Sequence, residues 1–377
     1  MSAPLRLARL EAFVFRAPIA VPVVTSFGTM RDRPMALVRV TDADGVSGWG
    51  EIWCNFPTVG AEHRARLAAS VLAPLVEGRT FASPAEAFAT LTARTAVLAL
   101  QSAEPGPIAQ AIAGVDVALW DLHARRLQQP LWRLLGGSSP RVRVYASGIN
   151  PEGAAALVAA RLAEGYRAFK LKIGFGAERD LANLAELRAL IGDLPLMVDA
   201  NQAWDLPLAQ DMSARFEAFG LGWLEEPLRA DRPWHEWQAL AGTARTPLAA
   251  GENLLGDAAF DAALASGALG VVQPDLAKWG GFSACLPLAQ RIRAAGRRYC
   301  PHYLGGGVGL AASAHLLAAA GGDGLLEIDA NENPLRTLAC GPIGKVEDGY
   351  ASLGDAPGLG FEIDPAALSR YAIPVTR

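Results

Sequence analysis

The chain has 377 residues, of which 51% are hydrophobic and 19% are charged, and its formal net charge is −4. Basic and acidic residues are interspersed, so no basic surface for nucleic acid or for an anionic membrane is indicated, and we expect neither partner. The N-terminal segment lacks the uninterrupted apolar core of a signal peptide, and the most apolar stretch, residues 308–320, is too short to span a bilayer.

The cysteines are few and widely separated in the sequence. None forms a Cys-x-x-Cys pair, so the pattern predicts neither a zinc site nor a disulfide framework. The four are Cys54, Cys285, Cys300 and Cys340. Together with the lack of a signal peptide, this predicts a soluble protein of the reducing cytoplasm.

Residues 1–130 are predicted to form a small α+β domain. Two β-type runs, at 36–42 and 46–54, flank the turn pair Asp44-Gly45 and so indicate a hairpin. Apolar residues at helical spacing then predict helices at 61–78, 83–98 and 108–127. Ser83-Pro84, followed by Glu86, is a typical helix start.

From about residue 141 the pattern changes to short apolar runs that alternate with helices rich in alanine and leucine. The expected strands are 142–147, 168–173, 194–200, 222–227, 247–252, 270–276, 297–302 and 325–330. Eight such strands with helices between most of them predict a TIM-like β/α barrel over residues 131–340. Residues 341–377 are expected to be irregular and to return to the N-terminal domain.

A charged or ionisable residue stands at or just after the end of each strand from the second to the eighth. These residues lie 23 to 27 positions apart: Lys172, Asp199, Glu225, Glu252, Asp275, His302 and Glu327. Because the active site of such a barrel is built from the carboxyl ends of its strands, we expect these side chains to share one site.

Lys170 and Lys172 are two positions apart and therefore lie on the same face of a strand. The apolar residues Phe169, Leu171 and Ile173 alternate with them and belong against the helices, so both lysines are expected at the barrel mouth. Crowding of like charges lowers the pKa of a lysine and makes it a usable base. The alternative is an edge strand with two solvated lysines.

Asp199, Glu225 and Glu252 end three consecutive strands, and three carboxylates so close together would repel one another without a cation. Such a set of hard oxygen ligands suits Mg²⁺. Separate helix caps or surface salt bridges are the alternative. Glu226 is adjacent to Glu225, and the spacing alone does not tell which of the two binds metal.

Asp275 and His302 end neighbouring strands, where the carboxylate can fix the tautomer of the imidazole and leave its other nitrogen as a general base. His63, His123, His235 and His315 have no such context and are expected at the surface or in packing. Glu327 is expected to hydrogen-bond a substrate oxygen or to form a structural salt bridge. The run Gly305–Gly309 before a helix predicts either an anion site at the helix N-terminus or a plain tight turn.

Taken together, these motifs resemble the mandelate racemase branch of the enolase superfamily over essentially the whole chain. The motifs are Lys170-Leu171-Lys172, Val198-Asp199-Ala200-Asn201, Glu225-Glu226-Pro227, Gly251-Glu252-Asn253, Pro274-Asp275-Leu276-Ala277-Lys278-Trp279-Gly280-Gly281, Pro301-His302 and Leu326-Glu327. The resemblance implies a (β/α)7β barrel, residues 131–340, with an α+β capping domain, residues 1–130, which the segment 341–377 completes. It also implies a homo-oligomer.

The resemblance also implies a role for each strand-end residue. It makes Asp199, Glu225 and Glu252 the ligands of one Mg²⁺, for which Mn²⁺ is a possible substitute. It makes Lys172 one base and His302, paired with Asp275, the opposite base, and places Lys170, Glu327 and Asn201 at the substrate. Relatives that use two lysines have a lysine at the position of Asp275, so Lys278 is expected to support the strand end rather than act as a base.

In this family, loops of the capping domain select the substrate. The corresponding segments are about 18–34 and 53–64. Arg31 and Arg33 are expected either to meet a second carboxylate or to be solvated loop charges. Four aromatic residues are expected to line the substrate pocket: Trp53, Phe56, Trp279 and Tyr303.

The predicted function is Mg²⁺-dependent removal of the α-proton of a small hydroxy-carboxylate substrate. Dehydration of an acid sugar to a 2-keto-3-deoxy acid is the first expectation. The alternative is a racemase or epimerase in which Lys172 and His302 each serve one enantiomer. A non-catalytic barrel and a Schiff-base aldolase acting through Lys172 or Lys278 are remote alternatives.

Overall fold

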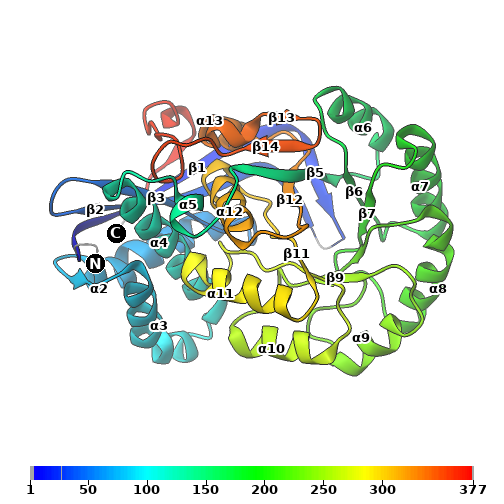
Figure 1. The fold of residues 1–377 in the computed structure, drawn as a ribbon, viewed down its shortest axis with the longest axis horizontal. Coiled ribbons are helices and arrows are strands. Elements are labelled where there is room, and N and C mark those ends of the chain that lie inside the picture. The colour runs from blue at the N-terminus through cyan, green and yellow to red at the C-terminus, as the bar shows by residue number, and fades with distance from the viewer. Residues whose placement is uncertain (1–3, 27, 376–377) are drawn as a thin grey trace.

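Two sheets organise the chain, a five-stranded antiparallel sheet near the N-terminus and a ten-stranded sheet that includes the strands of a barrel. The computed structural model describes residues 4–26 and 28–375. In Figure 1 the N-terminal sheet and its helices lie beside the barrel, and both marked chain ends lie on the side of the N-terminal sheet.

The N-terminal sheet is a meander of long strands. Strands β1 (Leu5–Thr25), β2 (Gly28–Asp42) and β3 (Ser47–Ile52) pair in antiparallel order, and β4 (Thr80–Phe81) joins β1. The helices are α1 (Gly60–Leu67), η1 (Ala68–Leu72), α2 (Ala73–Val76), α3 (Pro84–Gln101) and α4 (Pro105–Arg126). A Cβ at Gly50 would collide with the backbone of Gly114, so this glycine lets α4 pack closely on β3.

The eight barrel strands alternate with seven principal helices. The strands are β5 (Arg141–Ile149), β6 (Phe169–Lys172), β7 (Leu196–Asp199), β8 (Leu224–Glu225), β9 (Leu248–Ala250), β10 (Val271–Val272), β11 (Arg298–Tyr299) and β12 (Leu326–Asp329). The helices between them are α6 (Ala154–Ala163), α7 (Ala177–Ile191), α8 (Leu206–Phe216), α9 (Trp234–Ala241), α10 (Asp257–Ser266), α11 (Gly281–Ala294) and α12 (Gly307–Ala320). The predicted (β/α)7β barrel with an α+β N-terminal domain is confirmed.

The barrel interior is built in layers because strand side chains alternate between two faces. A buried apolar layer takes one residue at or beside each strand: Tyr145, Ala168, Met197, Trp223, Ala249, Val271, Cys300 and Leu325. Two positions further along each strand lie Ser147, Lys170, Asp199, Glu225, Gly251, Gln273, His302 and Glu327. The apolar layer closes the barrel below, and the second layer is largely polar.

The segment after the barrel is more regular than expected and contacts both parts of the chain. Helix α13 (Pro334–Ala339) and the short η3 (Gly341–Gly344) lead to β13 (Val346–Glu347) and β14 (Tyr350–Ser352). Strand β14 pairs with β5 of the barrel, whereas β15 (Ala372–Ile373), which follows η4 (Ser369–Tyr371), pairs with β1.

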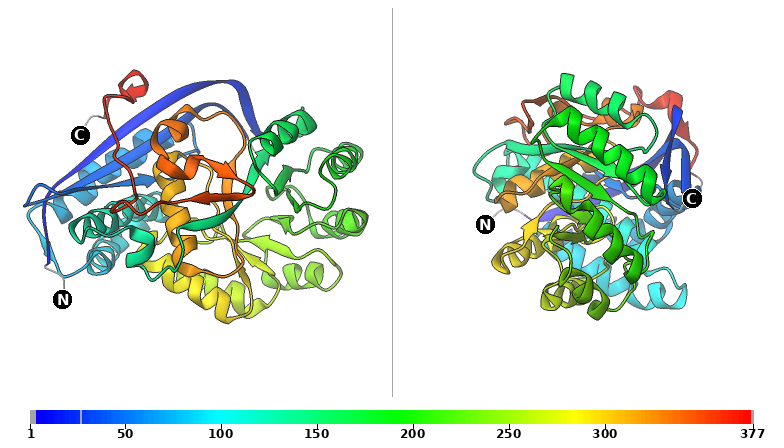
Figure 2. Two further views of the ribbon diagram at one scale, coloured as in Figure 1. Left: turned by 45° about the horizontal axis from the view of Figure 1, so that its top comes forward. Right: turned by 90° about the vertical axis from the view of Figure 1, so that its right-hand side faces the viewer.

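Residues 18–34, expected to be a loop, form the tip of the β1–β2 hairpin, apart from residue 27, which lies outside the described part. The register between β1 and β2 shifts between Pro18 and Val23, and such an irregularity bends a hairpin. The blue hairpin in Figure 2 bends from the N-terminal sheet toward the barrel. Ser26 Oγ there donates to the carbonyl of Asn201 at 2.7 Å, which fixes the tip beside the strand ends.

Two further features concern the described residues. The four cysteines there are all buried and free. Among residues 4–26 and 28–375, no helix has both the length and the apolar character needed to cross a membrane.

Candidate active site

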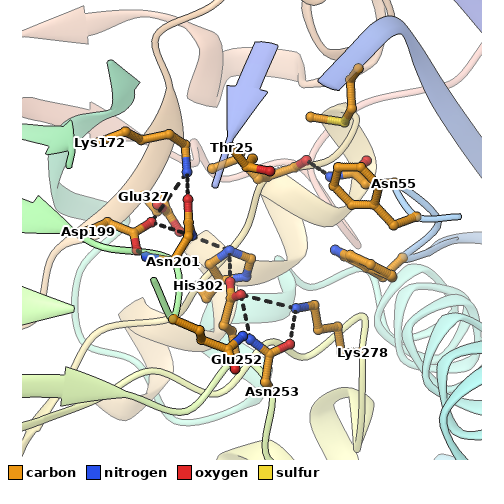
Figure 3. Close-up of a pocket in the computed structure, with 15 residues that line it drawn as sticks. Thr25, Asn55, Lys172, Asp199, Asn201, Glu252, Asn253, Lys278, His302 and Glu327 are labelled. Carbon is orange, nitrogen blue, oxygen red and sulfur yellow. Dashed lines mark hydrogen bonds and ion pairs between the residues drawn. The ribbon is translucent and has the colours of Figure 1, made fainter. Parts of the chain in front are cut away.

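A cavity of about 220 Å³ lies at the carboxyl ends of the barrel strands, beneath the hairpin tip. The capping domain contributes Thr25, Met30, Trp53, Asn55 and Phe56. The barrel contributes Lys172, Asp199, Asn201, Gln202, Glu252, Asn253, Lys278, His302, Leu304 and Glu327. Figure 3 shows these side chains gathered from strands far apart in the sequence.

Lys172, at the end of β6, is held at one wall of this cavity. Its Nζ donates to Asn201 Oδ1 at 2.6 Å and lies 3.4 Å from Asp199 Oδ2. Asn201 is in turn fixed by Asp199, which accepts from the backbone and side-chain N–H groups of Asn201 at 2.8 and 2.9 Å. Asn201 has a positive φ of 44°, a backbone conformation that costs energy in a residue other than glycine and is often found at functional sites.

Lys170 is on the same face but has other partners. Its Nζ lies 2.6 and 2.7 Å from the two oxygens of Glu225 and 2.8 Å from Glu327 Oε1. Burial lowers the pKa of Lys170, but the charges of Glu225 and Glu327 outweigh burial and raise it well above its usual value. The expectation that crowding lowers the pKa therefore does not hold for Lys170, because two carboxylates compensate its charge.

His302 and Asp275 form a buried pair. Nδ1 of His302 lies 2.8 Å from Asp275 Oδ2, and the other oxygen of Asp275 accepts from the backbone N–H of Ala277 at 2.8 Å. Nε2 of His302 points into the cavity and contacts the carboxylate of Glu252. Burial opposes the protonated imidazole, yet Glu252, Glu327 and Asp275 raise the pKa of His302 well above its usual value.

Glu225 and Glu226 have different surroundings. Besides Lys170, Glu225 accepts from Trp223 Nε1 at 3.0 Å and from Gln273 Nε2 at 2.7 Å. Glu226, which is 1% exposed, accepts from Asn253 Nδ2 at 2.8 Å. Burial and then the charges of Glu252 and Asp199 raise the pKa of Glu226 well above its usual value.

Glu327 is completely buried at the end of β12. It accepts from Ser147 Oγ at 2.5 Å and from the backbone N–H of Tyr303 at 2.9 Å. Burial raises its pKa, but Lys170 and His302 more than offset that effect and lower it. Glu327 therefore lies between the lysine side and the histidine side of the site.

The acidic residues supply carboxylate oxygens, the ligands that a hard divalent cation prefers, and each of Asp199, Glu225 and Glu252 also lies beside a cationic side chain. The charges of Glu252 and Asp199 both act on Glu226, and Lys278 Nζ lies 3.5 Å from Glu252 Oε1. In the described part of the chain no three His, Cys, Asp or Glu side chains converge on one ion-sized position. Glu225 is directed instead to Lys170 and Glu252 to His302, the nearest cationic groups.

The residues predicted to bind substrate divide into two groups. Trp53 and Asn201 line the cavity, as does Phe56. Three predicted substrate-binding residues do not line the cavity: Arg31, Trp279 and Tyr303.

Arg31 is exposed on the hairpin, so its charge faces solvent rather than the cavity. The Trp279 ring stacks on Phe260, with ring centroids 5.6 Å apart. Tyr303 is 2% exposed, and its ring is directed toward Glu51. Arg33 is buried as well, in an ion pair of 2.6 Å with Asp329 that joins β2 to the end of β12.

Several lining residues were not predicted as site residues from the sequence. Asn253 and Gln202 directly follow predicted residues, and that proximity was a usable signal. Lys278 lines the cavity with its Nζ 4.6 Å from the centre of the Trp53 ring, so it does more than support the strand end. Leu304 directly follows the predicted Tyr303 and so carries the same signal. Thr25, Met30 and Asn55 lie within the predicted segments 18–34 and 53–64, but no local pattern singles them out, because the folding of the capping domain over the barrel brings them to the cavity.

Two protein-family models match this chain. The mandelate racemase / muconate lactonizing enzyme N-terminal domain matches residues 9–136. The enolase C-terminal domain-like model matches residues 153–367.

Three curated relatives are cycloisomerases or dehydratases. The D-galactarolactone cycloisomerase of Agrobacterium fabrum is 35% identical over 70% of this chain and 74% of its own length. The 3,6-anhydro-alpha-L-galactonate cycloisomerase of Streptomyces coelicolor is 30% identical over 97% of this chain and 99% of its own. The arabinonate dehydratase of Saccharolobus solfataricus is 30% identical over 69% and 71%.

Solved structures agree with the sequence matches over the full length. A mandelate racemase/muconate lactonizing enzyme from Bordetella bronchiseptica RB50 is 59% identical, with a TM-score of 0.93 over 98% of this chain and 100% of its own. A racemase from Streptomyces coelicolor A3(2) with bound magnesium is 27% identical, with a TM-score of 0.87 over 97% and 100%. The family membership expected from the strand-end motifs is thus confirmed, and the chain belongs to the mandelate racemase/muconate lactonizing enzyme family.

Proposed function

We propose that this chain is a Mg²⁺-dependent enzyme that removes the α-proton of a hydroxy-carboxylate, and that its reaction is dehydration of an acid sugar to a 2-keto-3-deoxy acid. One observation carries the proposal. Two basic nitrogens, Lys172 Nζ and His302 Nε2, face one cavity from different strands, with the carboxylates of Asp199 and Glu252 beside them. A substrate carbon between two such bases is open to proton transfer on either face.

Asp199, Glu225 and Glu252 are proposed to hold one Mg²⁺, with Mn²⁺ as a possible substitute. The fit rests on three carboxylate oxygen donors and on the repulsion between the buried Asp199 and Glu225, which a hard cation would relieve. A bound divalent cation would stabilise the negative charge that a carboxylate gains when its α-proton leaves. For Glu225 to take part, one of its two oxygens must turn from Lys170.

Lys172 is proposed as one base. A lysine accepts a proton only through the lone pair of its neutral amine, so the position of Nζ decides which face of the substrate it serves. The bond of 2.6 Å to Asn201 Oδ1 holds Nζ at its wall of the cavity. Asn201 is thus proposed to orient this base and to contact the substrate.

His302 is proposed as the opposite base and as the acid for the leaving group. Asp275 accepts from Nδ1, so in the neutral imidazole the lone pair lies on Nε2, which faces the cavity. After taking a proton on Nε2, the imidazolium can donate it to the departing β-hydroxyl as water forms. Glu252, which contacts Nε2 here, must release it when substrate enters.

Lys170 and Glu327 are proposed to bind the reacting carboxylate. Nζ of Lys170 and Oε1 of Glu327 lie 2.8 Å apart, and both side chains are almost completely buried. The ammonium of Lys170 would attract the carboxylate as its charge grows. Glu327 would hydrogen-bond the same group in its protonated form, which the entry of a second anion favours.

Polar side chains in the cavity wall, which also includes Met30, Trp53 and Phe56, support a polyhydroxy acid as substrate. The wall on the capping-domain side includes the polar Thr25 and Asn55, and the barrel adds Asn253 and the cationic Lys278. Hydroxyl groups need such donors and acceptors when they leave water. The named substrates of the relatives, galactarolactone, anhydrogalactonate and arabinonate, belong to this class.

The second candidate is a racemase or epimerase, favoured by the presence of a base on each side of the cavity. The two functions share the first proton transfer and differ in the second step. In a dehydratase the β-hydroxyl leaves, whereas in a racemase a proton returns to the opposite face.

A screen of aldonic, aldaric and α-hydroxy acids and their lactones in D2O would test the proposal. We expect formation of a keto acid from at least one acid sugar, and loss of that activity with EDTA. Deuterium at Cα without a keto acid would favour the racemase. Neither exchange nor keto acid with any hydroxy acid would overturn both candidates.

We also propose a division at about residues 130 and 340 into capping domain, barrel and returning segment. The pairing of β15 with β1 supports the return. A homo-oligomer is proposed on the resemblance alone, and a location in the reducing cytoplasm on the widely separated cysteines. Light scattering on the purified protein measures the number of chains directly, and a monomer would contradict the proposal.

A further inference from the structure

The N-terminus of α12, in the glycine run after His302, binds a carboxyl group of the protein itself. Glu51, in β3 of the capping domain, is 2% exposed and accepts from the backbone N–H groups of Gly306 at 2.6 Å and Gly309 at 2.9 Å. These N–H groups belong to the N-terminus of α12, where a negative charge is stabilised. The group bound at this helix N-terminus is therefore a side chain of the protein, Glu51.

Close packing explains why glycine occupies these positions. A Cβ at Gly306 would lie 2.6 Å from Glu51 Oε1 and 2.5 Å from Met35 Sδ. The Tyr303 phenol lies beside the same carboxylate, and burial together with the Glu51 charge raises its pKa well above the usual value. The segment from His302 to α12 therefore fits closely around Glu51.

A second carboxylate of the capping domain reaches the preceding helix in the same way. Asp116, in α4, is 1% exposed and accepts from the backbone N–H of Ser283 at 3.0 Å and from its hydroxyl at 2.5 Å. Ser283 lies in the first turn of α11, which follows the loop that carries Asp275. Gly281 has a φ of +52°, and a Cβ there would collide with the Asp116 carboxylate.

Each loop also has a second tie to the segment after β3. The backbone N–H of Trp53 donates to the carbonyl of Ala277, two residues beyond Asp275, at 3.4 Å. The side chain of Asn55 donates to the carbonyl of Leu304, two residues beyond His302, at 2.5 Å. The capping domain thus holds both loops of the Asp275–His302 pair, each through a carboxylate and a further hydrogen bond.

We propose that Glu51 and Asp116 are positioning residues that set the Asp275–His302 pair by fixing the first turns of α12 and α11 against the capping domain. The inference rests on the proposed function of His302 as a base. Lys172 is placed differently, through Asn201 and Asp199 of the barrel itself. Loss of either capping carboxylate therefore disturbs the histidine side of the site and spares the lysine side.

Glu51→Gln and Asp116→Asn test the proposal in the full chain loaded with Mg²⁺. Each keeps the size of the side chain but removes an acceptor, so one donor in its helix turn is left unpaired. The low-field proton resonance of His302 Nδ1–H, assigned by its loss in His302→Asn, reports the bond to Asp275 without any turnover. We expect this resonance to shift or to exchange faster with water in both variants.

A second readout uses proton exchange at Cα. With a substrate from the screen, the variants should lose on the order of tenfold or more in exchange through His302, whereas exchange through Lys172 stays within about twofold. The ratio of the two rates separates a positional effect from a general loss of folded protein. Because the resonance needs no substrate, it still tests the inference if the proposed function fails.

Asp121→Asn is the matched control. Asp121 is also a completely buried carboxylate of α4, but it accepts from the backbone N–H groups of Trp49 and Leu359, at 2.8 and 2.7 Å, and touches neither loop. We expect this variant to lose thermal stability with the His302 resonance and the exchange ratio unchanged. If Glu51→Gln and Asp116→Asn behave like the control, the two carboxylates are only structural and the inference is overturned. Should one variant not fold, the other decides, because each carboxylate holds one loop.

Discussion

Glu225 and Glu226 are adjacent in sequence, yet their carboxylates have different surroundings. Glu225 lies two positions after Trp223 and so faces the barrel interior as Trp223 does, where it pairs with Lys170. Glu226 has a positive φ of 39°, which breaks the strand alternation and brings it near Glu252. The alternation rule therefore predicts the direction of Glu225 but not that of Glu226.

This difference leads to a prediction about metal affinity. Glu225→Gln should weaken Mg²⁺ binding so far that calorimetry detects none, because it removes a proposed ligand. Glu226→Gln should weaken it by no more than about tenfold, because Glu226 is only a neighbour of the proposed ligands, and burial with the charges of Glu252 and Asp199 favours its neutral form. Titration calorimetry of both variants measures this. The reverse order of the two effects would move the ligand role to Glu226.

The two proposed bases should be separable by substitution. His302→Asn and Lys172→Ala should each lower turnover by about 100- to 10,000-fold, since each removes a group that transfers a proton. In D2O, His302→Asn should retain exchange at the face that Lys172 serves. Proton NMR of the recovered substrate measures that exchange. Unchanged turnover in both variants would show that the active site lies elsewhere.

Among helices and strands, the hairpin of residues 18–34 is the clearest departure from expectation. The family resemblance implies a loop here, and the segment contains Pro18, Pro22 and Pro34, a residue that strands seldom include. The structure accommodates Pro18 and Pro22 near the shifted register of β1, where proline is tolerated. Apart from β5, which is longer, the barrel strands are also shorter than predicted, and β8, β10 and β11 have two residues each.

Helix α4 carries a pH-dependent contribution to stability through Asp116. Burial raises the pKa of this carboxyl from 3.8 to about 7, and the bonds from Ser283 only partly offset the effect. Between about pH 4 and pH 7 the folded state therefore holds a proton that the unfolded state has lost. This contribution to the free energy of unfolding thus falls as pH rises through that window, by about 4 kcal/mol at most.

Asp116→Asn should remove that dependence. The unfolding midpoint of the variant minus that of the unmodified protein should increase by several degrees when the pH is raised from 5 to 8. His315 has the opposite dependence, because burial lowers its pKa to about 4, but it is present in both proteins and cancels in the difference. Scanning calorimetry at the two pH values measures the effect. A constant difference would mean that Asp116 stays ionised across the window.

For the whole molecule, cation binding should appear as thermal stability. Mg²⁺ bound only to the folded state raises the free energy of unfolding by about 2.7 kcal/mol at a hundredfold excess over Kd. We expect the unfolding midpoint to rise with Mg²⁺ or Mn²⁺ and to fall again with EDTA. In Glu252→Gln the rise should vanish, and an equal rise there would place the cation elsewhere. The readout requires no substrate.

The sequence predicts the residues at the strand ends of the barrel better than the contacts between the domains. Residues such as Lys172, Asp199 and His302 follow from the barrel repeat, since each stands at the end of a strand of one common architecture. Contacts between the domains have no such period. The ion pair of Arg33 with Asp329 and the approach of Asn55 to Leu304 join positions roughly 250 to 300 residues apart, which no local pattern encodes.

The pairing of β15 with β1 has a consequence for biosynthesis. Val14 and Phe15 pair with Ile373 and Ala372, so the barrel is an insertion between two pieces of one sheet. A growing chain exposes that stretch of the β1 edge until the whole barrel has been translated, and an open strand edge invites pairing with other chains. Ribosome-bound chains that stop before residue 372 should therefore be the form most prone to aggregation, even when their barrels are already folded.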